Sequence, residues 1–318
     1  LRLNHELYRS APSPRDQSVS PPSARLGRTG LLLLVGIALG WGLNWPIMKH
    51  VLSRLPPLSF RSFCLVAGGL GVLLLARCAR QPITIPAHWR GSFAWITVTN
   101  ILGWNVFAIY GVWLLPSGRA ALLGYTMPIW SILLAAWLLD ERLDRRKLAA
   151  LTIGMCGTGA LIGADFAAMA RAPVGVLCML SAALSWAVGV ILIKRAPLPV
   201  PTVTLTGWSM LAAGLPMWLV ALFIEHIDWA RADGFALFGV LYNIGIAYMF
   251  CYWAWNRIVL MVPVAVSSLA SLVTPLVGVL GGMVFLGERP GALEWLGAGL
   301  VLGAQAVMAW PKRRQVDR

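Results

Sequence analysis

Two stretches of this chain, starting at Pro116 and Pro263, share one layout. Each opens with a proline, runs apolar for the length of a membrane span, carries a second proline and closes on a Glu-Arg pair. The landmarks recur at one constant spacing: Pro116, Pro128, Glu141 and Arg142 match Pro263, Pro275, Glu288 and Arg289. Such a recurrence indicates an internal duplication of about 145 residues.

The apolar content places the duplicated chain in a membrane. Of its 318 residues 58% are hydrophobic and 12% are charged, more apolar surface than a soluble domain of this length requires. Apolar stretches of about 20 residues are candidates for membrane-spanning helices. We predict an all-α membrane protein with ten transmembrane helices, near 29–49, 58–76, 91–114, 118–139, 147–164, 174–194, 202–224, 234–257, 263–286 and 292–310.

The basic residues set the predicted orientation. The net charge of +14 would suggest nucleic acid as a partner in a soluble chain, but here the basic residues cluster between apolar runs. With the N-terminus inside the cell, 19 of the 26 Lys and Arg fall in cytoplasmic segments. This bias predicts both termini in the cytoplasm of a cell inner or plasma membrane, with no nucleic-acid partner.

An odd number of helices in each half predicts that the second half is inverted relative to the first. Five helices per half give two inverted five-helix repeats, an arrangement found in many secondary transporters. The predicted units are a disordered cytoplasmic tail at 1–28, a first repeat at 29–164, a second repeat at 174–310 and a cytoplasmic tail at 311–318.

Three phrases of the sequence resemble the drug/metabolite transporter superfamily in its ten-helix EamA-type branch. They are GWGLNWPIMK, GYTMPIWSILLAAWLLDERLDRRKLAALTIGMCGTGALI and SSLASLVTPLVGVLGGMVFLGERPGALEWLGAGLVLGA. The resemblance implies transport of small metabolites, often export, through a cavity between the repeats. It also implies that helices 1–4 and 6–9 enclose the path while helices 5 and 10 stand outside. The first repeat departs from the usual Gly-Glu-Arg ending, because Asp140 precedes its Glu-Arg pair.

The predicted centre of the bundle contains aromatic and neutral polar residues. As a set they suit an amphipathic, uncharged or zwitterionic solute, although each aromatic alone fits a packing or lipid-facing role equally well. The predicted substrate-binding residues are Trp41, Asn44, Trp45, Trp104, Asn105, Tyr125, Ser185, Trp186, Tyr248, Tyr252, Ser267 and Ser271.

Pro128 and Pro275 are predicted to kink helices 4 and 9 beside the path. Proline lacks an N–H and clashes with the carbonyl four residues back, which would leave the carbonyls of Gly124 and Ser271 without helical partners. At that depth a freed carbonyl needs protein, water or a cavity beside it. The alternative is a packing kink satisfied by a neighbouring hydroxyl.

Charged groups are predicted to lie away from the centre. All twelve Asp and Glu fall in tails, loops or helix ends, so a proton-coupling carboxylate is missing and transport should not need a proton gradient. We identified Lys49 and Lys194 as the only basic candidates near the centre, both at helix ends. The Glu-Arg pairs are interpreted as shaping the turns that follow them.

Small-residue motifs and cysteines are assigned structural roles. Gly159-x-x-x-Gly163 and Gly299-x-x-x-Gly303 are expected to bring helices 5 and 10 against their own bundles, with contact to a second subunit as the alternative. The five scattered cysteines show no metal or redox spacing. We expect neither cofactor nor metal, and a monomer.

The function predicted from these features is secondary export of small amphipathic metabolites by alternating access. Aromatic or large apolar amino acids are the first choice of substrate. A flippase or exporter of another class, for lipid-linked sugars, nucleosides or drugs, is the alternative within transport. A membrane-embedded hydrolase is the distant alternative, but no nucleophile–base set or metal spacing supports an enzyme, and no phosphate-binding loop supports ATP-driven pumping. A receptor or structural role would leave the inverted repeat without a purpose.

Overall fold

The computed structural model describes residues 28–138, 145–163, 173–195, 198–255 and 264–309. The predicted tail at 1–28, except for Arg28, and the predicted tail at 311–318 lie outside these residues. Glu141 and Arg142 also lie outside them. Within them the chain is helical and contains no strand. The helices are α1 (Arg28–Leu52), α2 (Pro57–Cys78), η3 (Ala87–Trp89), α3 (Arg90–Ile96), η4 (Thr97–Gly103), α4 (Trp104–Leu114), α5 (Ser117–Gly124), α6 (Met127–Leu138), α7 (Arg145–Gly163), α9 (Pro173–Arg195), α10 (Thr202–Ile224), η5 (Trp229–Arg231), α11 (Gly234–Tyr242), η6 (Asn243–Phe250), α13 (Val264–Leu286) and α14 (Ala292–Ala309).

Seven helical segments in the described part of the chain are long and apolar enough to cross a membrane. Three shorter apolar helices, at Leu148–Ala160, Thr274–Leu286 and Ala292–Ala304, accompany them. Together they overlap the ten predicted spans one for one. The all-helical membrane class is therefore confirmed, whereas the count of ten crossings and the inverted relation of the halves stay predictions.

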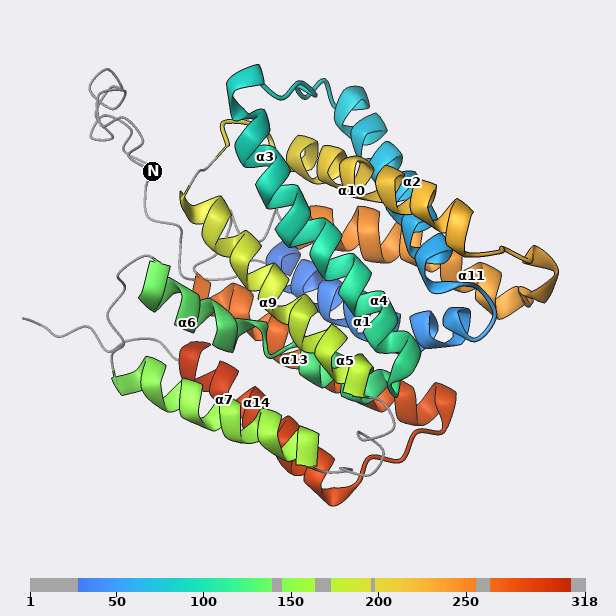
Figure 1. Ribbon diagram of the computed structural model, residues 1–318. Coiled ribbons are helices and arrows are strands. Elements are labelled where there is room, and N and C mark those ends of the chain that lie inside the picture. Colours follow the sequence, from blue (N-terminus) through green and yellow to red (C-terminus); the bar gives the residue numbers. More distant parts are fainter. Residues whose placement is uncertain (1–27, 139–144, 164–172, 196–197, 256–263, 310–318) are drawn as a thin grey trace, which may run out of the picture.

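Helices of the first half pack against helices of the second half (Figure 1). The second predicted span, α2, packs along the seventh, α10. The first, α1, packs along α13, and α9 packs against α4 and α6. The fifth and tenth, α7 and α14, pack on each other beside the remaining helices, as the resemblance implies.

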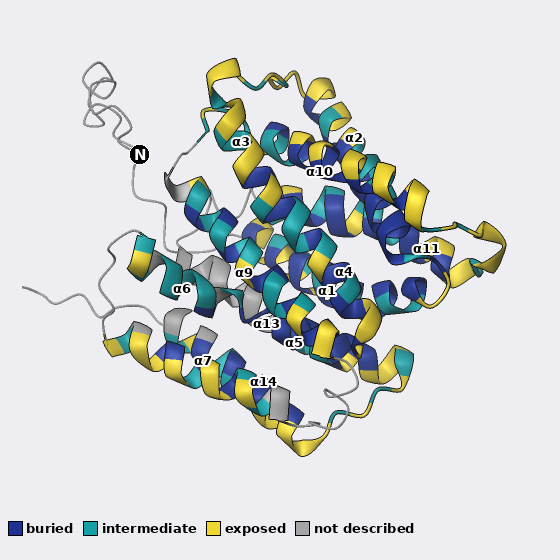
Figure 2. Cartoon of the chain, in the orientation of Figure 1, coloured by how far each residue is buried: buried dark blue, intermediate teal, exposed yellow. Residues whose placement is uncertain are grey.

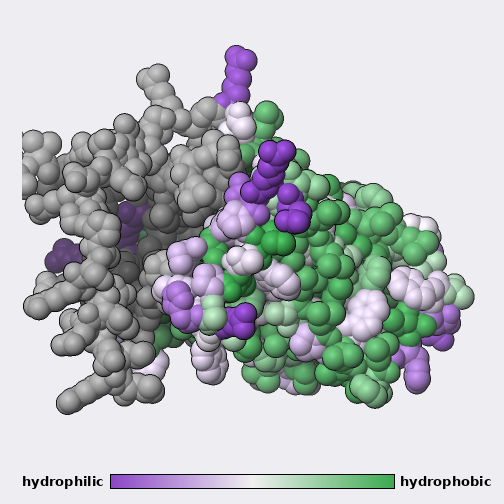
Figure 3. Space-filling view, turned by 90° about the horizontal axis from the view of Figure 1, so that it is seen from above, coloured by the Kyte–Doolittle hydropathy of each residue, from purple (hydrophilic) through white to green (hydrophobic). Residues whose placement is uncertain are grey.

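Large apolar side chains cover much of the outside of the bundle. Leu32, Leu74, Trp137, Phe223 and Val284 are each more than 60% exposed. Exposed residues run along the outer sides of α7 and α10 in Figure 2, and the face in Figure 3 is mainly hydrophobic where it is not covered by grey atoms. An apolar surface of this kind is stable against lipid and not against water.

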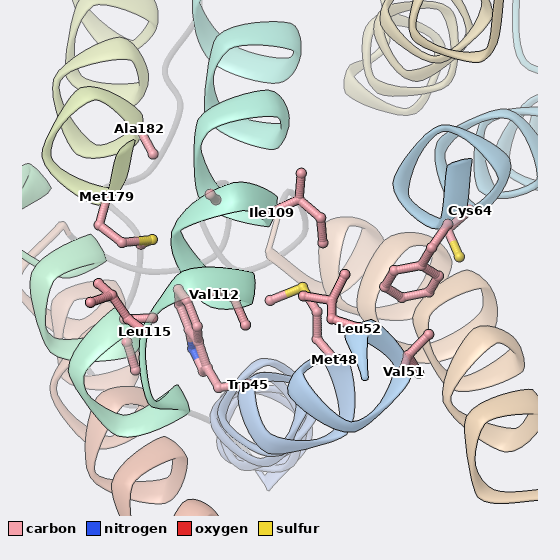
Figure 4. Packing of buried hydrophobic residues seen from close by; sticks show 14 of the residues in the cluster. Trp45, Met48, Val51, Leu52, Cys64, Ile109, Val112, Leu115, Met179 and Ala182 are labelled. Carbon is pink, nitrogen blue, oxygen red and sulfur yellow. The ribbon is translucent and has the colours of Figure 1, made fainter. Parts of the chain in front are cut away.

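The core lies where α1, α4 and α9 approach one another (Figure 4). Met48, Ile109, Val112 and Met179 are all nearly fully buried. A Cβ on Gly111 would overlap the Sδ of Met179, so this glycine allows α9 to approach α4. This packing holds α1, α4 and α9 together, and other turns of the same helices line the cavity described below.

Two π-helical segments, η4 and η6, occupy the third and eighth predicted spans. A π turn interrupts the regular α-helical ladder, so carbonyls near it become available to side-chain donors. The Ser185 hydroxyl donates to the Thr99 carbonyl in η4 at 2.6 Å, and the Trp41 indole donates to the Ala247 carbonyl in η6 at 2.9 Å. Each donor comes from the first helix of the opposite half.

The two mid-span prolines stand in different backbone settings. The fourth span is interrupted: α5 ends at Gly124 and α6 begins at Met127, just before Pro128. Proline disfavours helical backbone in the residue before it and clashes with the carbonyl four residues back, here that of Gly124. In the ninth span, α13 continues through Pro275.

Three of the four glycines in the predicted contact motifs make no close helix contact with described residues, and the side-chain position of Gly163 is outside those described. A Cβ added at Gly159, Gly299 or Gly303 would meet nothing within 4 Å. The close contact between α7 and α14 is made instead at Gly157, where a Cβ would lie 2.8 Å from that of Leu300. At Gly159, Gly299 and Gly303 the prediction is wrong, because small-residue spacing identifies a helix face but not which face its neighbour covers.

Candidate substrate cavity

A cavity lies between the two halves of the chain. Seven of its thirteen described lining residues are aromatic, and a few polar groups lie among them, the mixture typical of a site for a small organic ligand. The lining comes from both halves. It consists of Trp41, Asn44, Trp45, Met48, Arg61, Trp104, Ala108, Tyr125, Met127, Trp186, Ala247, Tyr248 and Tyr252.

Two aromatic pairs provide flat walls. Trp104 and Trp186, from opposite halves, meet edge to face with ring centroids 5.4 Å apart. Tyr248 and Tyr252 are stacked, with centroids 6.1 Å apart and planes within 8°. Aromatic faces and edges of this kind favour a ring-bearing solute.

Eight of the twelve predicted substrate-binding residues line this cavity. They are Trp41, Asn44, Trp45, Trp104, Tyr125, Trp186, Tyr248 and Tyr252. The other four do not appear in its lining. Ser185 donates its hydroxyl to the backbone of η4, and the side chains of Ser267 and Ser271 are outside those described. A role in substrate binding stays a prediction for all twelve.

Asn105, the remaining predicted residue, lies behind the cavity wall and is fully buried. Its Oδ1 accepts two hydrogen bonds, from the Arg61 Nε at 2.6 Å and from the Tyr248 hydroxyl at 2.7 Å. Its Nδ2 donates to the Ile101 carbonyl at 2.7 Å. Asn105 therefore holds two lining residues in place.

Arg61 is a basic group at the cavity that the sequence analysis missed. The prediction that Lys49 and Lys194 are the only basic candidates near the centre is wrong, because Arg61 lines the cavity and is 6% exposed. Arg61 lies close to the start of the second predicted span, where a basic residue is expected to face the water outside the membrane. A basic residue one turn inside an apolar run was the available signal, because such residues usually face the bundle interior.

Carboxylates and amides close the bundle at the end where α1 meets α2 and α4 meets α5. Glu288 accepts hydrogen bonds from the Ser117 and Gly118 amides, at 2.6 and 3.0 Å, at the N-terminus of α5. Glu225 accepts from the Leu58 and Ser59 amides, at 3.0 and 2.7 Å, at the N-terminus of α2. Both contacts join the two halves of the chain.

Glu288 therefore does more than shape the turn that follows it. A carboxylate gains little from the C-terminal end of its own helix, but it is stabilised at the N-terminus of another. At the same end, Lys49 Nζ donates to the Val112 and Trp113 carbonyls at 3.0 and 2.7 Å, beside the last turn of α4. Neither residue lines the cavity, so these contacts close an end of the bundle instead of forming the site.

Asp233 joins the same end of the bundle. Its carboxylate caps α11 by accepting from the Ala236 amide at 2.7 Å, and it contacts His50 and Arg54, each at 3.1 Å. The Ala236 amide, then the His50 side chain, and finally the Arg54 charge lower the pKa of Asp233 below its ordinary value, against a smaller desolvation effect. The ionised carboxylate is the form that these contacts stabilise.

The family that the sequence matches agrees with this arrangement of two helical repeats around a cavity. The model of the EamA-like transporter family matches residues 28–163 and again 173–310. The chain belongs to the EamA-like transporter family. Two copies of the family model in one EamA-like chain agree with the internal duplication read from the sequence.

Curated relatives of this EamA-like chain are transporters. A probable amino-acid metabolite efflux pump of Salmonella typhimurium is 27% identical, over 86% of this chain and 92% of that protein. The aromatic amino acid exporter YddG of Ancylobacter novellus is 24% identical, over 91% of this chain and 97% of that one. The family and these relatives indicate a membrane transporter and not an enzyme.

A solved structure supports the fold independently. It matches this EamA-like chain with a TM-score of 0.64 at 22% identity, covering 88% of this chain and 96% of the other. At this identity the likeness concerns the fold alone.

Proposed function

We propose that this protein is a secondary transporter that exports aromatic or large apolar amino acids by alternating access. The aromatic cavity between the halves is the observation that supports the substrate class most directly. Its faces can contact a side-chain ring, and its neutral polar groups can orient a polar head. The names of the amino-acid-exporting relatives support the same class.

The proposal includes a location and a mode of action. The protein acts as a monomer in the cell inner or plasma membrane, with both termini cytoplasmic, because the basic residues favour that orientation. Solute moves when the halves change which end of the cavity is open.

A flippase for lipid-linked substrates receives less support. A larger groove lies elsewhere on the molecule. Its lining comes from α2 and the residues just after it, from the start of α10, and from η6 with the residues that follow it; it includes Leu75, Gln81, Val200, Thr202 and Trp253. Its described lining shares no residue with the aromatic cavity. A lipid-linked substrate needs a site that joins a polar cavity to such an opening, so the amphipathic solute is favoured.

The test replaces one cavity tryptophan and one tryptophan elsewhere. Trp186 lines the cavity, whereas Trp95 is 67% exposed on α3 and absent from the lining. We expect Trp186→Ala to lower phenylalanine efflux from preloaded proteoliposomes by up to about tenfold, because losing an aromatic contact of roughly 0.5–1.5 kcal/mol weakens binding by about twofold to tenfold.

Trp95→Ala should transport like the unmodified protein. Equal efflux by both variants, at equal amounts of inserted protein, would contradict the proposal. Efflux of a lipid-linked sugar but not of amino acids would favour the flippase.

A further inference from the structure

Arg61 is the only charged residue among the described residues that line the aromatic cavity. It lies one turn inside α2, and the other lining residues are all uncharged. A buried guanidinium stays charged, because arginine is not deprotonated in proteins, and its charge is costly in a membrane interior unless it is paired.

The described neighbours of Arg61 are neutral. Its Nε donates to Asn105 Oδ1 at 2.6 Å, and its Nη1 contacts Met48 Sδ at 3.4 Å. The guanidinium carbon lies 5.1 Å from the centroid of the Tyr248 ring. Among the described residues no carboxylate forms an ion pair with it.

The guanidinium therefore has binding capacity to spare. Of its five N–H groups, Nε–H and one on Nη1 are used, which leaves three without an acceptor in the described part of the chain. Because Asn105 fixes the Nε edge, the remaining groups are oriented in advance. Two parallel N–H groups match the two oxygens of a carboxylate.

A second unpaired group lines the same cavity. Asn44 is 8% exposed, and its Oδ1 has no hydrogen-bond partner among the described residues. A buried acceptor without a donor is rare in proteins and costs free energy. An ammonium group of a ligand would satisfy it.

We propose that Arg61 binds the carboxylate of the transported solute while the Asn44 Oδ1 accepts a hydrogen bond from its α-amino group. The aromatic walls then contact the side chain, so the ligand class is an aromatic α-amino acid in its zwitterionic form. Asn105 is a positioning residue that orients Arg61. This assignment rests on the proposed function for the identity of the solute and adds which end of the solute is recognised.

The test compares four probes that differ only in the polar head: phenylalanine, phenylalaninamide, phenylpropionate and phenethylamine. Binding to the purified full chain is followed by its own tryptophan fluorescence, which these ligands do not mask. The unmodified protein should bind phenylalanine and phenylpropionate at least about tenfold more tightly than the amide and the amine. Equal binding of acid and amide would overturn the assignment without any variant being needed.

Two variants locate the preference at Arg61. Arg61→Gln should reduce the preference for the acid to within about twofold, and Arg61→Lys should keep part of it, because lysine retains the charge but not the paired N–H geometry. A full preference in Arg61→Gln would overturn the assignment, as would failure of both carboxylates to bind the unmodified protein.

Efflux of phenylalanine from proteoliposomes separates this assignment from the proposed function. Export without any preference for the acid refutes the role of Arg61 and leaves the function standing. Binding of phenylpropionate that depends on Arg61, without phenylalanine export, supports the role of Arg61 and refutes the function.

Discussion

Gly157 and Gly159 lie two positions apart on α7 and face different surroundings. A Cβ at Gly157 would lie 2.8 Å from the Cβ of Leu300 and 2.9 Å from the Val301 nitrogen. At Gly159 it would meet nothing within 4 Å. The pair offers a matched test of how closely α7 and α14 are packed.

Gly157→Ala should destabilise the protein by about 1–3 kcal/mol, because the backbone of α14 cannot move aside as a flexible side chain could. Gly159→Ala should be neutral or slightly stabilising, because alanine is the better helix former. The apparent Tm in detergent, followed by loss of the soluble monodisperse fraction on heating, measures both. Equal Tm values for the two variants would show that the helices are further apart than described.

Residue type predicted the aromatic residues of the cavity lining more accurately than the positions of the charged and polar residues around it. Large aromatic residues at mid-span positions were accessible to sequence reasoning, because few other roles at that depth require so many of them. Arg61 was missed because a position near a helix end says little about whether a long side chain reaches inward. Asn105 was predicted to line the cavity but lies behind its wall, because spacing along a helix identifies the face on which a residue lies and not the neighbour that covers it.

Asp233 is an N-cap that also joins two elements, since its carboxylate contacts α11 together with His50 and Arg54 near the end of α1. Replacing the cap with alanine leaves the first amides of α11 without this acceptor. Asp228 caps only η5, a three-residue turn with no buried residue, and serves as the control.

Asp233→Ala should therefore lower the Tm at neutral pH more than Asp228→Ala does. Because folding lowers the pKa of Asp233, its contribution is present above the ordinary aspartate pKa and is lost as the pH falls through the lowered value. The Tm difference from the unmodified protein should shrink on acidification. Asp233→Asn should keep the cap at neutral pH while losing the charge, and a difference constant over all pH values would contradict the role of the charge.

The element boundaries were largely predictable, and the irregular helix geometry was not. Apolar runs located the spans because water cannot satisfy a backbone inside lipid. The π-helical segments η4 and η6 depend on donors from the opposite half, Ser185 and Trp41. No residue pattern within η4 or η6 predicts the π-helical geometry.

The orientation of the whole molecule can be tested at two exposed positions near opposite predicted ends. In a version without its native cysteines, Ser53→Cys should react with a membrane-impermeant maleimide in intact cells. Arg145→Cys should react only after permeabilisation, because the charge bias places it in the cytoplasm. Labelling of Arg145→Cys in intact cells would reverse the assignment.

The carboxylates at the helix N-termini bear on how the two halves exchange conformations. Glu288 and Glu225 each reach from the second half to a helix start in the first. To open that end, both contacts must give way to water, which solvates amides and carboxylates well. At roughly 0.5–2 kcal/mol for each cap, the two bias the equilibrium between closed and open populations by about fivefold to a thousandfold. If the protein alternates access as proposed, these two contacts favour the closed form by that factor, and a solute that binds the open form more tightly by a similar factor would offset them.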